Sequence, residues 1–230
     1  MQFEFCTTSI KRPEVLDKTY ESFSRNLDKI CLKDCRLWLN VDPFPNNSTI
    51  TSKKLEEVAR KYFGSVSVFY PTKCNFSIAI KKLWNSASDE LIFHLEDDWV
   101  LEKKINIHDM VKMFLENPKL LQIRLRWFNT NSTISKKDIL KLNKIQFGLS
   151  PCIIRKSFYK KIAKIINVNF NPEMQIRSIF ANPTNKECVY YPNEKVISDY
   201  GFLWRDLNKI NVRRYKIKYL KVKEKFKTKK

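Results

Sequence analysis

The chain has 230 residues and a net charge of +20 at pH 7, with 43% hydrophobic and 13% aromatic residues. This length suits one sizeable α/β domain, and the apolar content is enough to build a packed core. Only three glycines occur and neither G-x-G-x-x-G nor G-x-x-x-x-G-K is present, which weighs against a glycine-rich phosphate loop. The six cysteines include no C-x-x-C pair, so a structural zinc site is not expected.

The positive charge is concentrated at the C-terminus, where residues 211–230 contain ten Lys or Arg and one Glu. A segment of this kind attracts polyanions, including anionic membrane, nucleotide diphosphates and nucleic acid. The first residues are typical of a strand rather than a signal peptide, and no apolar run is long enough to span a bilayer. We therefore expect a cytoplasmic domain over residues 1–210, followed by a basic tail at 211–230 that can rest on an anionic membrane.

The first hundred residues alternate between strand and helix patterns. A helix that Pro13 opens follows the first strand, because proline is well placed in a first helical turn. Apolar spacing then predicts strands at 2–8, 36–41, 66–70 and 91–95, separated by helices that include 53–63 and 75–87. This alternation predicts a mostly parallel central sheet flanked by helices.

The order is looser in the second half of the chain. A helix is expected from about 107 to 117, a strand at 120–127 and another strand at 146–154. Ser157 is expected to cap the helix that follows. A further helical stretch begins near Glu173.

An acidic cluster, Glu96-Asp97-Asp98, follows the apolar run at 91–95. In open α/β sheets, ligands bind outside the carboxyl ends of the strands, and carboxylate oxygens suit Mg²⁺ or Mn²⁺. An acidic turn after a core strand has the same local pattern. The preceding segment favours the metal hypothesis, because Asn75 is a suitable N-cap for an amphipathic helix that leads directly into the strand.

This order of helix, strand and acidic cluster resembles the glycosyltransferases of the GT-A fold, especially the inverting group around family 2. The resemblance implies a single GT-A (Rossmann-like) domain that binds a nucleotide sugar with Mn²⁺ or Mg²⁺. Glu96-Asp97-Asp98 stands where that family has its D-x-D motif, with Glu96 replacing the first Asp. The Arg that the family often carries on the preceding helix is absent, and Lys81 is the nearest basic substitute.

The resemblance also implies roles for residues around the acidic cluster. The nucleotide-sugar contacts would be Thr7, Thr8, Arg12, Asp42, Asn75, Lys81, Glu96, Asp97 and Arg205. The metal ligands would be Asp98, Glu96 and Asp199. Each of the flanking groups has a simpler interpretation: a polar strand end at Thr7, an Asp-Pro turn at Asp42, and a loop before a helix at Asp199.

The second half of the chain would build the acceptor site. An inverting transfer needs one general base, and the resemblance points to Glu173. An equally good interpretation is a Glu in the first turn of a helix, where the helix dipole favours a negative charge. Trp99, Arg124, Arg126 and Trp127 would contact the acceptor. The two arginines share one face of a strand and could meet an anionic acceptor, the diphosphate or only solvent. Trp99 could stack on a sugar or pack at the sheet edge.

The predicted function is metal-dependent transfer of a sugar, with inversion, from a nucleotide-sugar donor to a glycan, a lipid-linked acceptor or another hydroxyl. A nucleotidyltransferase is the first alternative, although it would more often show a glycine-rich loop near its start. The second alternative is a basic nucleic-acid-binding module, which would bind with a steep salt dependence and would not require Asp98. We do not expect nucleic acid to be the partner.

Overall fold

A seven-stranded sheet forms the centre of the molecule within the residues that the computed structural model describes, 3–44, 49–128, 146–180 and 187–207. Its strands run in the order β10-β8-β9-β5-β1-β3-β4. They are β1 (Glu4–Ile10), β3 (Arg36–Asp42), β4 (Ser65–Phe69), β5 (Leu91–Glu96), β8 (Gln122–Leu125), β9 (Cys152–Arg155) and β10 (Cys188–Tyr191). Strand β9 is antiparallel to β5 and β8, while the other neighbours in this sheet are parallel.

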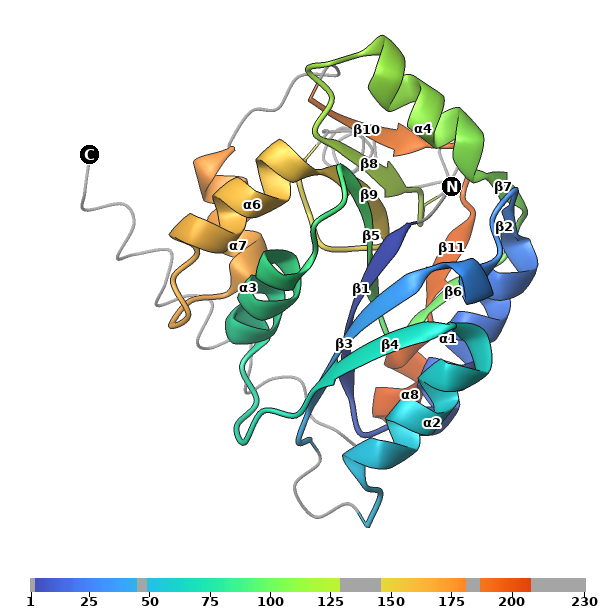
Figure 1. Ribbon diagram of the computed structural model, residues 1–230, viewed down its shortest axis with the longest axis vertical. Helices are drawn as coiled ribbons and strands as arrows, with labels where there is room; N and C mark the ends of the chain where they lie inside the picture. Colours follow the sequence, from blue (N-terminus) through green and yellow to red (C-terminus); the bar gives the residue numbers. More distant parts are fainter. Residues whose placement is uncertain (1–2, 45–48, 129–145, 181–186, 208–230) are drawn as a thin grey trace.

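Helices cover both faces of the sheet (Figure 1). The helices that pack on one face are α1 (Pro13–Asn26), α2 (Ser52–Tyr62) and α4 (Ile107–Glu116), and those on the other are α3 (Phe76–Ser86), α6 (Lys156–Ile165) and α7 (Pro172–Ile179). The short elements are β2 (Leu27–Asp28), the 3-10 helix η1 (Leu32–Asp34), β6 (Trp99–Leu101), β7 (Ile105–Asn106), β11 (Ile197–Asp199) and α8 (Gly201–Leu207). Strand β11 pairs antiparallel with β6, and β2 pairs parallel with β7. No helix in these residues has the length and apolarity to cross a bilayer.

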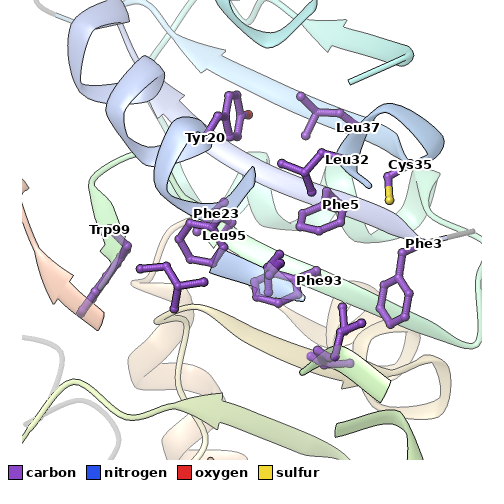
Figure 2. Close-up of a cluster of buried hydrophobic side chains, with 14 of the residues drawn as sticks. Phe3, Phe5, Tyr20, Phe23, Leu32, Cys35, Leu37, Phe93, Leu95 and Trp99 are labelled. Atoms are coloured by element: carbon purple, nitrogen blue, oxygen red, sulfur yellow. The ribbon is translucent and has the colours of Figure 1, made fainter. Parts of the chain in front are cut away.

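Aromatic side chains fill the core on the α1 and α2 face (Figure 2). The Phe5 and Phe93 rings stack with their centroids 5.0 Å apart, and Phe23 of α1 meets Phe93 edge-on at 5.7 Å. Each such side chain contributes about 1.5–3 kcal/mol when it is fully buried. This packing fixes α1 against β1 and β5, the two strands whose carboxyl ends carry the candidate site.

The opposite face carries a row of side chains in register across four strands. Cys6 of β1 lies between Trp38 of β3 and His94 of β5, and His94 in turn pairs with Cys152 of β9. His94 is fully buried, and its ring meets Trp84 of α3 edge-on at 5.7 Å. The two cysteines are also fully buried, as expected of small apolar residues in a core.

The alternating first half of the chain is confirmed, including the Asn75 cap, whose side chain accepts a hydrogen bond from Ile78 N–H. Two predictions for the second half are wrong. The strand expected at 146–154 begins only at Cys152, because side chains from β8 bind the backbone before it. The helix α6 has Arg155 rather than Ser157 at its N-cap, without a side-chain cap bond.

Candidate active site at the carboxyl edge of the sheet

The predicted acidic cluster lies where β5 and β1 end side by side. Thr8 pairs with Glu96, and the Thr8 carbonyl accepts a hydrogen bond from Asp97 N–H at 3.1 Å. Ser9 and Arg12 follow directly on the β1 side. The fold thus brings the start of the chain and the acidic cluster to one place, as a parallel sheet requires of adjacent strand ends.

Asp97 is held entirely by the protein. It is buried, and its carboxylate accepts hydrogen bonds from Ser9 Oγ at 2.7 Å and from Ile10 N–H at 3.1 Å. Arg12 binds both of its oxygens, through Nε at 3.0 Å and Nη2 at 2.5 Å. We therefore interpret Asp97 as an internal anchor of the site rather than a contact of the nucleotide.

Arg12 links the anchor to Asp98. Its Nη2 also donates to Asp98 Oδ2 at 2.7 Å, and its guanidinium lies 5.3 Å from the centroid of the Trp204 ring. Burial opposes the charge of Arg12, but the Asp97 and Asp98 carboxylates raise its pKa above the ordinary value. Arg12 is therefore a fixed cation beneath the site.

The segment from Asp199 to Arg205 lies against the acidic cluster, although it comes much later in the sequence. Tyr200 N–H donates to the Asp98 carbonyl at 2.7 Å, and Asp199 pairs with Trp99 in the β6–β11 ladder. Gly201 touches Asp98 so closely that a Cβ at this position would lie 2.1 Å from Asp98 Oδ2. Only glycine leaves room for this carboxylate.

Arg205 lies over the same two acids. Its Nη1 is 3.9 Å from Asp98 Oδ2, and its Nη2 is 3.7 Å from Asp199 Oδ2. The predicted grouping of Asp98, Asp199 and Arg205 is thus present in space, although about a hundred residues separate its members in the sequence.

Crowded carboxylates give this place its electrostatic character. Burial raises the pKa of Asp98 to about 6; Arg12 opposes the rise, and Asp97 and Asp199 add to it. Burial and the Asp98 carboxylate also raise the pKa of Glu96 well above its usual range. Repulsion of this kind is relieved by a cation placed among the oxygens.

No group of three or more His, Cys, Asp or Glu side chains could by itself hold a metal ion in the described parts of the chain. The acids present still fit one class of cation. Mg²⁺ and Mn²⁺ commonly bind through one or two carboxylates and take their remaining ligands from substrate phosphates and water. Asp98 and Asp199 supply two such carboxylates, joined through Arg205.

The charge of Glu173 reaches Glu96 and contributes to the raised pKa of that residue. Glu173 stands in the first turn of α7, where its Oε1 accepts hydrogen bonds from Arg177 Nη2 at 2.8 Å and from Leu149 N–H at 3.4 Å. Glu173 is thus held by a backbone N–H of another segment in addition to the i,i+4 pair with Arg177 that a first-turn Glu commonly makes.

Four of the predicted nucleotide contacts make no hydrogen bond or ion pair with the acids of the cluster within the described residues. Thr7 is fully buried in β1, and Lys81 is half-buried in α3. Asn75 caps α3 and donates to the Val168 carbonyl at 3.0 Å. Asp42 ends β3, accepts from Asn40 Nδ2 at 2.9 Å, and has its pKa raised by burial.

Two predicted acceptor contacts are corrected by their burial. Trp99 is only 8% exposed and packs in the core, so its ring offers no open face for a sugar. It serves the site instead by donating from Nε1 to Glu96 Oε2 at 3.0 Å. Arg124 is 4% exposed and is bound by neutral groups, so it does not lie on a solvated strand face. Trp127 is 41% exposed and remains available.

Several residues of the site were not anticipated from the sequence. Ser9 completes the shell of Asp97, and Trp204 stacks on Arg12. Gln122 donates to the Gly148 carbonyl, and Tyr190 OH accepts from Arg124. Ser9 follows the predicted contact Thr8, and Trp204 precedes the predicted contact Arg205. Gln122 and Tyr190 gave no sequence signal, because their partners lie 26 and 66 residues away.

Comparison with known proteins gives a likeness in structure alone. No protein-family model matches the chain, and no curated protein matches it in sequence. Residues 1–349 of TarS from S. aureus in complex with UDP superpose with a TM-score of 0.60 at 11% identity, covering 86% of this chain and 60% of that one. The mannosyltransferase PcManGT from Pyrobaculum calidifontis, with GDP-Man and Mn²⁺, gives 0.52 at 9% identity, covering 80% and 56%.

A cytidylyltransferase from Leptospira borgpetersenii serovar Hardjo-bovis is also similar, with a TM-score of 0.52 and 16% identity, covering 85% of this chain and 77% of that one. The chain spans 36% to 60% of the length of the TarS chains that it matches. These likenesses concern the fold. Together with the mostly parallel sheet between two helical layers, they confirm the GT-A fold predicted from the sequence.

Proposed function

We propose that this chain is a glycosyltransferase that moves a sugar from a nucleotide-sugar donor to a hydroxyl acceptor. The observation that carries the proposal is the meeting of Asp98, Asp199 and Arg205 at the carboxyl edge of a GT-A sheet. Similar structures support it, because TarS has been solved with UDP and with UDP-GlcNAc, and PcManGT with GDP-Man and Mn²⁺. In our proposal the nucleotide lies across the ends of β1, β3 and β5.

A divalent cation would be held by Asp98 and Asp199, with Glu96 close by. When bound, such an ion stabilises the negative charge that develops on a leaving diphosphate. Arg205 would contribute a fixed positive charge to the same diphosphate, because its guanidinium already lies beside both carboxylates. Arg12 would stay beneath, keeping Asp98 in place.

Glu173 is proposed as the general base. It would accept the proton of the acceptor hydroxyl while that oxygen attacks the anomeric carbon, which leaves the sugar with inverted configuration. Its two donors, Leu149 N–H and Arg177, would orient the carboxylate toward the acceptor. A glycan or a lipid-linked glycan remains the proposed acceptor. The basic segment proposed to contact membrane, 211–230, lies outside the described residues.

Nucleotidyl transfer is a second candidate, favoured by the cytidylyltransferase likeness. It would use a nucleoside triphosphate, release pyrophosphate and leave the nucleotide on the product. The turn between β1 and α1 contains no glycine. Sugar transfer releases a nucleotide, whereas nucleotidyl transfer releases pyrophosphate, so one assay can separate the two reactions.

The test is a turnover assay with a panel of nucleotide sugars and nucleoside triphosphates, with Mn²⁺ or Mg²⁺ and with EDTA. We expect nucleoside diphosphate or monophosphate release from one sugar donor, reduced at least a hundredfold in Asp98→Asn. Asp34→Asn, an exposed acid far from the site in the sequence, is the matched control and should retain full activity. Pyrophosphate release from a triphosphate would favour the second candidate. Binding of RNA or DNA that is indifferent to Asp98→Asn, without any turnover, would overturn both.

A further inference from the structure

The arginines on the two sides of the sheet edge differ in their partners. Arg12 and Arg205 on the donor side each contact carboxylates. On the other side, Arg124 and Arg126 of the β8 segment contact no carboxylate within the described residues. Cations taken partly out of water without an opposite charge are costly, so a site that keeps them there is suited to an anion from outside.

Arg124 is not the residue that would meet such an anion, because neutral groups of the protein occupy its donors. Its Nε and Nη2 donate to Ser150 Oγ at 3.1 and 2.7 Å, and its Nη1 donates to the Gln146 carbonyl and Tyr190 OH, both at 2.9 Å. A Cβ at Gly148 would lie 2.6 Å from the guanidinium carbon. Arg124 therefore positions the segment 146–150.

Arg126 has fewer partners than Arg124 within the described residues. It is half-buried, its Nε donates to the Pro192 carbonyl at 3.2 Å, and its two terminal nitrogens have no hydrogen-bond partner among the described residues. Aromatic rings flank the guanidinium, with the centroids of Phe128 and Tyr190 at 5.0 and 5.6 Å. Burial lowers the pKa of Arg126, as expected of a cation without a carboxylate partner.

The backbone of Arg126 ties this cation to the site. Its carbonyl accepts from Val196 and Ile197 N–H, at 2.9 and 3.3 Å, at the start of the strand that leads to Asp199. Strand β8 points the same way as β5 and lies two strands from it, with β9 between. Arg126 is therefore on the same edge as Asp98 but displaced toward the side where Trp127 is exposed.

We propose that Arg126 binds an anionic group, a phosphate or a carboxylate, on the acceptor, with the exposed Trp127 beside it. A guanidinium whose two terminal nitrogens bind no described residue matches the paired oxygens of such a group. The diphosphate of the donor is the less suitable anion, because Arg205 already lies at Asp98, two strands away. The assignment of the anion to an acceptor rests on the proposed function, whereas the anion site itself does not.

The experiment follows the indole N–H signals of the five tryptophans by NMR. Trp127 adjoins Arg126, and Trp204 adjoins Arg12 and thus reports on the donor side. The full chain is titrated at constant ionic strength with glycerol 1-phosphate, with glucuronate as a carboxylate, and with neutral glycerol. Short-chain phosphatidylglycerol, below its micelle concentration, tests whether a lipid carries the phosphate. Trp127→Phe assigns the reporting signal.

We expect glycerol 1-phosphate or glucuronate to move the Trp127 signal saturably, while glycerol leaves it unchanged. Arg126→Gln should weaken this binding at least tenfold and Arg126→Lys less, whereas Arg25→Gln, an exposed arginine on α1, should have no effect. An unchanged Trp204 signal in each variant shows that the fold is kept. Tighter binding of phosphatidylglycerol than of glycerol 1-phosphate assigns the phosphate to a lipid headgroup, and equal binding assigns it to phosphate alone.

Two outcomes would overturn the proposal. In one, the anions move Trp204 and not Trp127, which would place them at the diphosphate site. In the other, Arg126→Gln binds them as well as the unaltered chain does. Neither result depends on turnover, so the anion site and the glycosyltransferase proposal fail separately. Once an acceptor is known, Arg126→Gln should raise its KM while leaving the donor KM unchanged.

Discussion

Two buried arginines in this molecule are stabilised in different ways. Arg12 is surrounded by the carboxylates of Asp97 and Asp98, whereas Arg124 is surrounded by a hydroxyl, a carbonyl and a phenol. Both are less than 10% exposed. The difference separates the proposed donor side, where carboxylates balance Arg12, from the proposed acceptor side, where no described carboxylate balances Arg124. It teaches that hydrogen-bond satisfaction and charge compensation are independent requirements, and that ligands can supply the second.

The largest expected effect comes from removing charge on the balanced side. Asp97→Asn leaves Arg12 with half of its compensation and turns one acceptor of the anchor into an amide donor. We expect a loss of about 3 kcal/mol in the free energy of unfolding, measured by urea denaturation, because breaking a buried ion pair strands its partner.

The matched control for this substitution is Glu21→Gln, which removes an exposed pair with Arg25, where both side chains are more than half exposed. Its cost should stay below about 1 kcal/mol. Equal costs for the two variants would show that Asp97 is not the anchor that its four donors indicate.

The donor side was the more predictable of the two from sequence, and the reason is local. An apolar strand, a helix with its Asn75 cap and an acidic cluster lie within about 25 residues, and each follows from spacing and propensity. The partners of the cluster were harder to assign. The sequence predicts that Asp97 contacts the ligand, yet its partner Arg12 lies 85 residues away. The two can be paired only through the β1–β5 register.

The acceptor side was less predictable because its contacts are almost all long-range. An arginine in a strand is expected in solvent, but Arg124 is buried by groups 26 and 66 residues distant. The segment 146–150 has strand-like composition, but Gln122 takes the hydrogen bonds of Gly148 that a neighbouring strand would have taken. The pairing of β6 with β11 involves three residues, too few for a periodic signal.

A substitution on the acceptor side should have a smaller effect on stability. Arg124→Met removes hydrogen bonds to Ser150, Gln146 and Tyr190, but it also removes a buried charge that no described carboxylate compensates. The two changes partly cancel, so we expect a loss of about 1–2 kcal/mol.

Hydrogen exchange distinguishes this loss from global weakening. Amides of residues 148–150 should exchange about tenfold faster in Arg124→Met than the global loss alone accounts for, while amides of β1 are accelerated only by the global loss. A cost as large as that of Asp97→Asn would contradict the contrast between the two arginines, because neutral partners would then matter as much as carboxylates.

His94 is a third case beside the two arginines. It is a buried polar side chain whose ring nitrogens have no hydrogen-bond partner in the described structure. Burial lowers its pKa to about 3 from an ordinary value of 6.5. Between these values the unfolded chain binds the proton and the folded chain does not. Stability must therefore rise with pH there, by about 1.4 kcal/mol for each pH unit from this residue alone.

Urea denaturation at pH 7 and pH 5 measures the effect, with His94→Phe as the variant that keeps a ring against Trp84. From pH 7 to pH 5 the unaltered chain should lose about 2 kcal/mol more than the variant, because only the last 1.5 or so pH units lie below the unfolded pKa. Identical losses would mean that His94 has a polar partner, such as a buried water that stabilises the imidazolium. The interior between the two sides would then be wetter than its apolar lining implies.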